Sequence, residues 1–376
     1  LIDAVTWAES EGLERVILSG MGRSFAAGAD TKEFDQPAIS PHLPDVVNRI
    51  ETSAVPWIAA IHGTALGGGG ELALGCRYRI ARADATIGFP EVILGLVPGA
   101  GATQRLPRLV GLAEALKLIP TGKTISGKAA MAIGLVNAID DDPVAAAKLI
   151  DQKILSEAVP LSLMKAGTDK TVNYDTARQI AIRRMRGQEA PLTAISLLKT
   201  AQTATFDDGM QKERNAFLAL RASSQARALR HIFFAERAAK KPPKAIERQK
   251  STLKPLNHVI VIGGGTMGSG IAYAFLNANI RVTILESDDA GMQRANTAID
   301  TIISASLASG HIDPQAATDR RNLLKVMMIQ PDSDTGKWRN DDLANVDLLI
   351  EAVFEDLAIK KEILRAIEPA LDPNAI

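Results

Sequence analysis

A strand-like run that leads directly into a glycine-rich loop sets the strongest limit on the fold of the second half of this chain. Val259-Ile-Val-Ile262 is followed at once by Gly263-Gly-Gly-Thr-Met-Gly268 and then by the helical segment Ile271-Ala-Tyr-Ala-Phe-Leu276. In such a unit the first glycine permits the turn, the second leaves room for a pyrophosphate, and the third lets the helix pack on the strand. The order predicts a parallel sheet that binds a dinucleotide.

An acidic residue after the next expected strand narrows the choice of dinucleotide. Arg281-Val-Thr-Ile-Leu285 has the pattern of a strand, and Glu286 follows it. A carboxylate at this place suits the ribose hydroxyls of NAD and repels the extra phosphate of NADP. We therefore predict NAD as the cofactor, and its expected contacts from this part of the chain are Gly263, Gly265, Thr266, Met267, Gly268 and Glu286.

A second glycine cluster lies in the first half of the chain and runs into a glutamate. Ile61-His-Gly-Thr-Ala-Leu-Gly-Gly-Gly-Gly-Glu-Leu-Ala-Leu-Gly-Cys76 has the pattern of a strand, a turn and a short helix that begins near Gly69, with Glu71 in its first turn. Amides at a helix start are unpaired, and the helix dipole attracts negative charge there. The Gly68 N–H is the best candidate donor to a ligand oxygen, since no side chain obstructs it.

A further turn, Phe25-Ala-Ala-Gly-Ala-Asp30, follows another expected strand and offers the Ala29 N–H from the opposite side. Two such amides make an oxyanion hole, which stabilises a thioester carbonyl as it becomes enolate-like. Glu91 follows a proline turn on an element separate from Glu71. We therefore predict that the two carboxylates converge on one water as an acid/base pair.

These segments resemble the crotonase (enoyl-CoA hydratase/isomerase) family. Pro98-Gly-Ala-Gly101 and Thr103-Gln-Arg-Leu106 extend the resemblance, which runs from residue 12 to about residue 139. It implies an α/β fold, the crotonase-like spiral of ββα repeats, and a substrate that is an unsaturated acyl thioester of coenzyme A.

The resemblance also implies a role for each residue of the predicted site. The positions of Ala29 and Gly68 supply the oxyanion hole. Glu71 activates water for attack at the β-carbon of a trans-2-enoyl-CoA, and Glu91 delivers a proton to the α-carbon. The same glutamates would also move a Δ3 double bond to Δ2.

Four further side chains lie near these motifs. The resemblance implies that Asp30 and Lys32, at the first turn, contact coenzyme A. His62 and Cys76 lie in or beside apolar runs without a matching ligand or triad partner, so we interpret both as packing residues.

The second half resembles the 3-hydroxyacyl-CoA dehydrogenases over Val259–Glu286, Asp347–Asp356 and Lys360–Leu364. The resemblance implies that Glu355 and Lys360 lie near the cofactor. The family's catalytic serine and its His/Glu dyad belong to motifs further along than this chain extends. We therefore expect the second domain to bind NAD without catalysing hydride transfer in this chain.

Changes in pattern along the chain predict three parts. Residues 1–190 form a crotonase-like domain, 191–253 a helical appendage and a basic, proline-containing linker, and 254–376 part of a Rossmann NAD-binding domain. Both ends have the pattern of a truncated domain. The order resembles the multifunctional enzymes of fatty-acid β-oxidation, with hydratase and dehydrogenase in one protein.

Composition limits the partners. Lys+Arg and Asp+Glu both number 43, so no overall field attracts nucleic acid, and no apolar run reaches the roughly 18 residues of a membrane helix. A single cysteine excludes an internal disulfide framework. We expect an acyl-CoA substrate, and a thiolase or a second copy as partner of the longer protein. The location would be the cytoplasm in a bacterium, or the mitochondrial or peroxisomal matrix in a eukaryote.

Two other functions stay open. Crotonase-like sites also support other reactions through an enolate, such as decarboxylation and dehalogenation, although the two glutamates favour hydration. The chain would alternatively be a nonenzymatic module that binds acyl-CoA and NAD.

Overall fold

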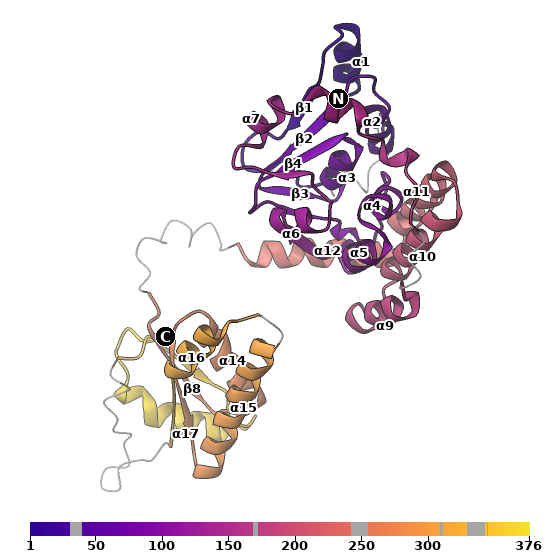
Figure 1. The fold of residues 1–376 in the computed structure, drawn as a ribbon. Helices are drawn as coiled ribbons and strands as arrows, with labels where there is room; N and C mark the ends of the chain where they lie inside the picture. Colours follow the sequence, from indigo (N-terminus) through magenta and orange to yellow (C-terminus); the bar gives the residue numbers. More distant parts are fainter. Residues whose placement is uncertain (31–39, 168–171, 242–254, 309–310, 329–342, 344) are drawn as a thin grey trace. The chain divides into compact units, whose positions relative to one another are not determined.

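The computed structural model describes residues 1–30, 40–167, 172–241, 255–308, 311–328, 343 and 345–376. The chain divides into two compact units, 1–242 and 243–376, which Figure 1 colours from indigo to pink and from orange to yellow. The first unit has two sheets and the second has one, and no hydrophobic cluster of the described residues contains residues from both units.

The main sheet of the first unit is parallel, in the order β1-β2-β4-β7. Every residue of β2 is buried, because this central strand, Trp57-Ile-Ala-Ala-Ile61, is apolar throughout and is covered on both faces. The strands are β1 (Val16–Ser19), β2 (Trp57–Ile61), β4 (Tyr78–Ala81) and β7 (Ala138–Ile139).

A smaller second sheet contains β3, which follows β2, β5, which follows β4, and β6, which precedes α6. Its order is β3-β5-β6, with β3 parallel to β5 and β6 antiparallel to it. A helix follows the strand pairs β2–β3 and β4–β5, which confirms the predicted ββα repeat. The elements are β3 (Thr64–Leu66), α3 (Gly68–Gly75), β5 (Thr86–Gly88), the 3₁₀ helix η2 (Pro90–Leu94), β6 (Thr124–Ser126) and α6 (Gly127–Ala132).

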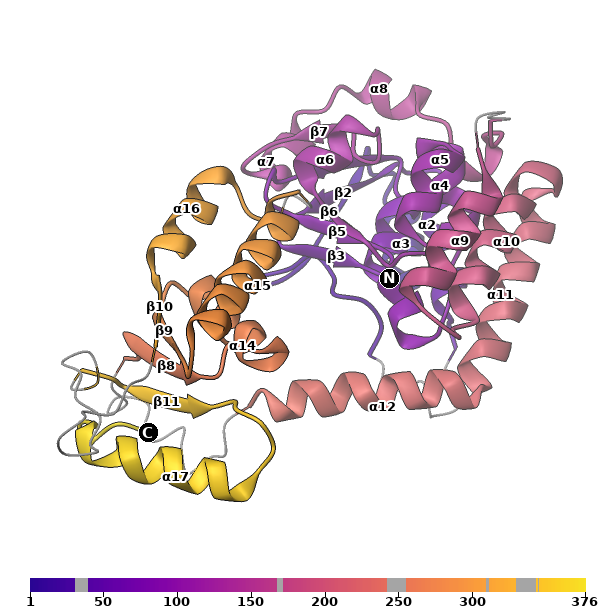
Figure 2. The same cartoon turned by 90° about the horizontal axis from the view of Figure 1, so that it is seen from below.

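The remaining helices of this unit cover the sheets and extend the core. α10 and α11 lie beside each other and contact α4, as Figure 2 shows. Leu198 of α10 and Leu220 of α11 belong to the same buried cluster as Trp57, so the helical appendage shares the core of the ββα domain. The helices are α1 (Ile2–Ser10), α2 (Leu43–Glu51), α4 (Ala102–Val110), α5 (Leu112–Leu118), α7 (Pro143–Lys148), α8 (Gln152–Glu157), η3 (Leu161–Leu163), α9 (Tyr174–Arg184), α10 (Ala190–Thr203), α11 (Phe206–Ala222) and α12 (Ser224–Ala239).

The second unit is a parallel sheet in the order β10-β9-β8-β11. Val259 and Val261 of β8 belong to one cluster, with residues of α14 and α15, whereas Ile260 and Ile262 belong to another, with Ile367 of α17. Successive residues of a strand point to opposite faces, so helices cover both faces, as predicted for a Rossmann domain. The elements are β8 (His258–Ile262), α14 (Thr266–Asn277), β9 (Arg281–Glu286), α15 (Asp289–Ala308), α16 (Pro314–Asn322), β10 (Leu324–Met328), β11 (Leu348–Glu351), α17 (Leu357–Ile367) and η6 (Glu368–Ala370).

Helix lengths bear on the membrane expectation. Within the part of the chain that the structure describes, no helix has the length and apolar character needed to span a bilayer.

Cys76 is buried, and burial raises the pKa of its thiol to about 12, which agrees with its interpretation as a packing residue.

Candidate active site

Glu71 enters the core of the first unit because α3 begins immediately after β3. The connecting residue, Gly67, has φ +54°, a conformation that favours glycine, and α3 then carries Glu71 in its first turn. The residue is only 3% exposed. Its Oε1 accepts hydrogen bonds from the N–H groups of Ala100 (2.7 Å) and Ala102 (3.1 Å), so the carboxylate has a fixed orientation.

Glu91 reaches the same place from η2. Pro90 begins this short helix, and the residue before it, Phe89, is buried. A Cβ placed on Gly67 would lie 2.9 Å from Glu91 Oε1, so the carboxylate lies against the start of α3. The other oxygen, Oε2, is buried and has no hydrogen-bond partner among the described residues.

The surroundings of the two carboxylates favour different protonation states. Burial and then the negative charge of Glu71 raise the pKa of Glu91 well above its ordinary value. Burial also raises the pKa of Glu71, but the amides of residues 100 and 102 and the nearby Arg105 oppose that rise. Glu91 is therefore the better proton donor and Glu71 the better base, a division typical of acid/base pairs.

The two predicted oxyanion donors lie close together. The chain at Ala26 pairs with β3 as a short parallel bridge, and this pairing brings the following turn against α3. A Cβ placed on Gly68 would lie 3.7 Å from the backbone N of Ala29. Neither the Ala29 nor the Gly68 N–H has an acceptor among the described residues. A single ligand oxygen can therefore approach both donors.

The structure describes one of the two predicted coenzyme A contacts. Asp30 is exposed at the end of the first turn. Lys32 falls outside the residues that the structure describes.

Sequence reasoning missed a third buried carboxylate, Glu213 of α11. It is fully buried, and its oxygens accept hydrogen bonds from the amides of Gly101 (2.6 Å) and Thr103 (2.8 Å). Burial and the charge of Glu71 raise its pKa to about 8. The signal that marks it is helical spacing, because Glu213 lies four residues after the buried Gly209 and seven before the buried Leu220.

The glycine loop of the second unit has the geometry that a pyrophosphate requires. Gly263 has φ +88°, and a Cβ placed on Gly268 would lie 1.7 Å from the carbonyl oxygen of Gly263. On Gly265, by contrast, a Cβ would have no atom within 4 Å. Thr266 begins α14 without a side-chain cap, so the first amides of this helix are available to phosphate oxygens.

The other predicted NAD contacts lie at the end of β9, in the first turn of α14, and in or just before α17. Glu286, at the end of β9, accepts a hydrogen bond from the Gly264 N–H at 2.5 Å. Met267 is 75% exposed in the first turn of α14. Lys360 contacts Glu355 at 2.8 Å and also Glu351 at 3.1 Å, the latter a residue that the sequence did not indicate.

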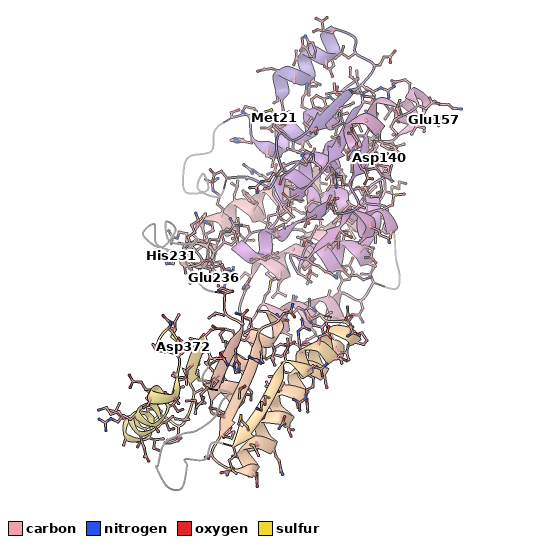
Figure 3. All side chains as sticks on the ribbon, turned by 90° about the vertical axis from the view of Figure 1, so that its left-hand side faces the viewer. Met21, Asp140, Glu157, His231, Glu236 and Asp372 are labelled. Atoms are coloured by element: carbon pink, nitrogen blue, oxygen red, sulfur yellow. The ribbon has the colours of Figure 1, made fainter. Side chains whose placement is uncertain are left out.

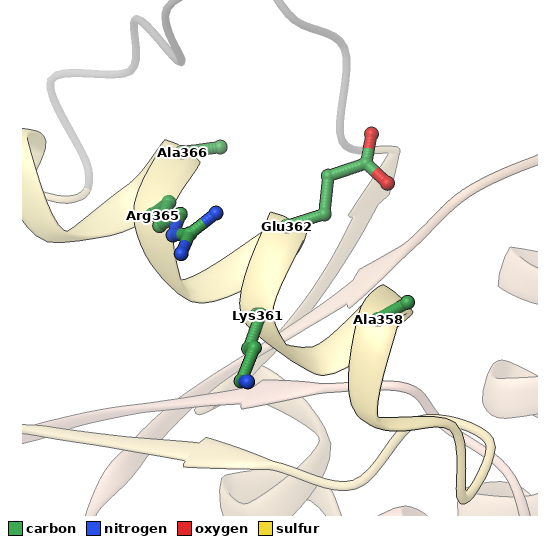
Figure 4. A pocket seen from close by; sticks show the side chains of 5 residues that line it. All are labelled: Ala358, Lys361, Glu362, Arg365 and Ala366. Atoms are coloured by element: carbon green, nitrogen blue, oxygen red, sulfur yellow. The ribbon is translucent and has the colours of Figure 1, made fainter.

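A separate hollow of about 520 Å³ lies along one face of α17 (Figure 4). None of the predicted site residues lines it. We assign it no role, because all its lining residues come from this one exposed helix: Ala358, Lys361, Glu362, Arg365 and Ala366.

Each unit matches the model of a known protein family. The family model described as enoyl-CoA hydratase/isomerase matches residues 1–216, and that of the 3-hydroxyacyl-CoA dehydrogenase NAD binding domain matches residues 258–376. The second unit is therefore an NAD-binding domain, as the glycine loop and the acidic residue predicted.

Curated relatives match across almost the whole chain. Peroxisomal bifunctional enzymes of Cavia porcellus and Homo sapiens are 36% and 35% identical, over 99% and 96% of this chain and 52% and 50% of their own length. The fatty acid oxidation complex subunit alpha of Shewanella baltica is 33% identical over 94% of this chain and 51% of its own. The chain thus spans about half the length of the curated relatives it matches.

Proposed function

We infer that the first unit hydrates trans-2-enoyl-CoA thioesters, because this chain belongs to the enoyl-CoA hydratase/isomerase family and carries an NAD-binding domain of the 3-hydroxyacyl-CoA dehydrogenase type. The observation that carries the proposal is the pair of buried carboxylates whose surroundings favour opposite protonation states, Glu71 as the base and Glu91 as the acid. The neighbouring amides of Ala29 and Gly68 add the donors that such a reaction needs.

Each step uses a group that the site provides. Glu71 takes a proton from water as the water oxygen bonds to the β-carbon of the enoyl group. The electron pair of the double bond moves toward the thioester carbonyl, whose oxygen gains negative charge and is held by the Ala29 and Gly68 amides. Glu91 then donates its proton to the α-carbon, which yields the 3-hydroxyacyl thioester. Proton exchange with solvent restores both carboxyl groups.

The same two carboxylates support a second reaction, the shift of a Δ3 double bond to Δ2. This reaction moves a proton between the α- and γ-carbons through the same enolate and uses no water. The buried, unpaired Oε2 of Glu91 favours it, since a proton on that oxygen has no competing acceptor among the described residues.

The second unit would receive NAD at its glycine loop. The amides at the start of α14 would hold the pyrophosphate, and Glu286 would hold the ribose. The ion pair of Lys360 and Glu355 would lie near the bound cofactor. NAD supplies a hydride acceptor when bound. Hydration produces the 3-hydroxyacyl thioester that such a dehydrogenase oxidises, so one chain that holds both sites raises the local concentration of the intermediate. We assign the oxidation step to the whole protein.

We also propose the organisation and setting that the sequence predicted. Residues 1–190 would be the hydratase domain, 191–253 its helical appendage and linker, and 254–376 the NAD-binding part. The relatives include peroxisomal enzymes and bacterial complex subunits, which support a peroxisomal matrix in a eukaryote or the cytoplasm in a bacterium. A thiolase or a second copy would be the partner of the whole protein.

The proposal is tested with the purified chain and crotonyl-CoA. We expect the absorbance of the conjugated enoyl thioester to fall as 3-hydroxybutyryl-CoA forms, with chromatography to identify the product. If the absorbance stays constant while the chain still binds butyryl-CoA, the hydratase proposal is wrong and the nonenzymatic module is favoured. Loss of CO₂ or halide from suitable acyl thioesters, without hydration, would instead favour another enolate reaction.

A further inference from the structure

We propose that Glu213, on α11 of the helical appendage, is a positioning residue of the hydratase centre that fixes the orientation of Glu71. It would act by holding the turn of residues 99–103, whose amides in turn hold the catalytic carboxylate. The inference rests on the proposed function for its catalytic consequence, but its structural basis is independent of the substrate.

Glu213 holds this turn with both of its oxygens. Oε1 accepts the Gly101 N–H at 2.6 Å, and Oε2 accepts the Thr103 N–H at 2.8 Å and the Thr103 hydroxyl at 2.5 Å. All of these groups are buried, so a lost hydrogen bond is not replaced by water. The side chain therefore fixes two alternate amides of the turn.

The amides between them serve Glu71. Those of Ala100 and Ala102 donate to Glu71 Oε1 at 2.7 and 3.1 Å. Four consecutive amides thus point alternately to two carboxylates from different helices, α3 and α11. A rotation of the turn that releases Glu213 would also move the donors that orient Glu71.

The turn has little freedom to compensate. Gly101 has φ +107°, and a Cβ there would lie 2.9 Å from Met210 Sδ on α11. A Cβ on Gly99 would lie 2.7 Å from the ring of Phe217, also on α11. Helix and turn are therefore in direct contact on both sides of the Glu213 hydrogen bonds.

A buried cation also holds the turn. Arg105 donates to the carbonyl oxygen of Ala100 at 2.9 Å and forms a fully buried ion pair with Glu51 at 2.8 Å. The charged groups around the turn are thus Glu71 from α3, Glu91 from η2 and Arg105 from α4. Glu213 adds negative potential to this set and raises the pKa of Glu91.

The replacement Glu213→Gln tests the inference at pH values above about 8, where Glu213 is charged, because the amide keeps the shape but offers one acceptor oxygen instead of two. We expect the kcat for crotonyl-CoA hydration to fall by about 10- to 100-fold with little change in KM, as for other small displacements of catalytic groups. The alkaline limb of kcat/KM, which reports loss of the Glu91 proton, should move to lower pH because a nearby negative charge is gone. Glu236→Gln, at an exposed position on α12 (Figure 3), should behave as wild type.

A pair of milder replacements decides the question if Glu213→Gln does not fold. Thr103→Val removes one hydrogen bond to Glu213, whereas Thr103→Ser keeps it. We expect a loss of several-fold in kcat for the first and recovery in the second. Equal rates for the two, or wild-type kcat and an unmoved alkaline limb in Glu213→Gln, would overturn the inference.

Amide hydrogen exchange separates this inference from the proposed function. In Glu213→Gln the amides of residues 100–103 should exchange at least tenfold faster than in wild type, whether or not the chain hydrates crotonyl-CoA. Failure of the wild-type chain to hydrate the substrate would count against the proposed function alone. Unchanged exchange in this turn would count against the positioning role alone.

Discussion

At the scale of single residues, the site depends on how two identical side chains are treated differently. Glu71 accepts two backbone hydrogen bonds, whereas Oε2 of Glu91 accepts none among the described residues. A charged oxygen is stabilised by donors, and a buried oxygen without donors favours the protonated form. The backbone of the 99–103 turn therefore decides which glutamate is the base.

Removal of the base should abolish most of the activity. We expect Glu71→Gln to lower kcat for crotonyl-CoA hydration by at least ~100-fold, since a general base typically contributes that much. The change is measured by enoyl absorbance in the purified chain. Glu157→Gln, on an exposed side chain of α8 (Figure 3), is the matched control and should keep wild-type kcat. A wild-type rate in Glu71→Gln would remove Glu71 from the mechanism.

The buried carboxylates should also make stability depend on pH. The pKa of Glu213 is about 8 in the folded chain, above the ordinary 4.5 that it regains on unfolding. The folded state thus binds more protons between these values, so this stabilisation is fully present below about pH 4.5 and is lost as pH rises through about 8. Thermal unfolding of the first unit should show a Tm that falls across this window, and Glu213→Gln should reduce the fall. An equal slope in both proteins would contradict this origin.

Residues differ in how far the sequence revealed them. Glu71, Glu91 and the two oxyanion amides could be found because glycine turns leave a local mark in the sequence. Glu213 has no glycine turn beside it. Its helical spacing is consistent with burial, but its role depends on contact with a turn more than a hundred residues earlier. Local patterns cannot show a partner that only the tertiary fold supplies.

At the scale of elements, the same limit separates long strands from short ones. Strand β2, Trp57–Ile61, is a run of five apolar residues, a pattern that indicates a buried strand. The strands of the second sheet have three residues each, which is too short for an alternating pattern to stand out. The ββα repeat could therefore be predicted only through the family resemblance.

The start of α14 offers a paired test on one element. Gly268→Ala would place a methyl group 1.7 Å from the Gly263 carbonyl oxygen, so we expect a lower Tm for the second unit and loss of NADH binding. Gly270→Ala, two residues further along and exposed, meets no atom within 4 Å. It should bind NADH normally and gain up to about 1 kcal/mol from the better helix propensity of alanine.

The measurements are NADH fluorescence titration and thermal unfolding. If Gly268→Ala binds NADH as tightly as Gly270→Ala does, the loop would not need the close approach of helix and strand that the structure shows. Equal destabilisation of the two variants would likewise contradict the steric explanation, since the two replacements differ only in what surrounds the added methyl group.

At the scale of the whole molecule, the two units have separate hydrophobic cores within the described residues. The first core joins the ββα domain to α10, α11 and α12, and the second unit has one core on each face of its sheet. The sequence predicted two different α/β parts and a basic connection between them. The sequence could not predict that the helical appendage shares a core with the ββα domain, because residues far apart in the chain form that core.

Because the cores are separate, we expect a mutation in one unit to leave the activity of the other unit unchanged. Glu71→Gln should bind NADH with the wild-type Kd, and Gly268→Ala should hydrate crotonyl-CoA with the wild-type kcat, because mutations at independent sites add without coupling. Combining both changes should give the sum of the two single effects on each measurement. Loss of hydratase activity in Gly268→Ala would show that the NAD-binding unit supports the hydratase centre, and would replace two independent sites by one coupled system.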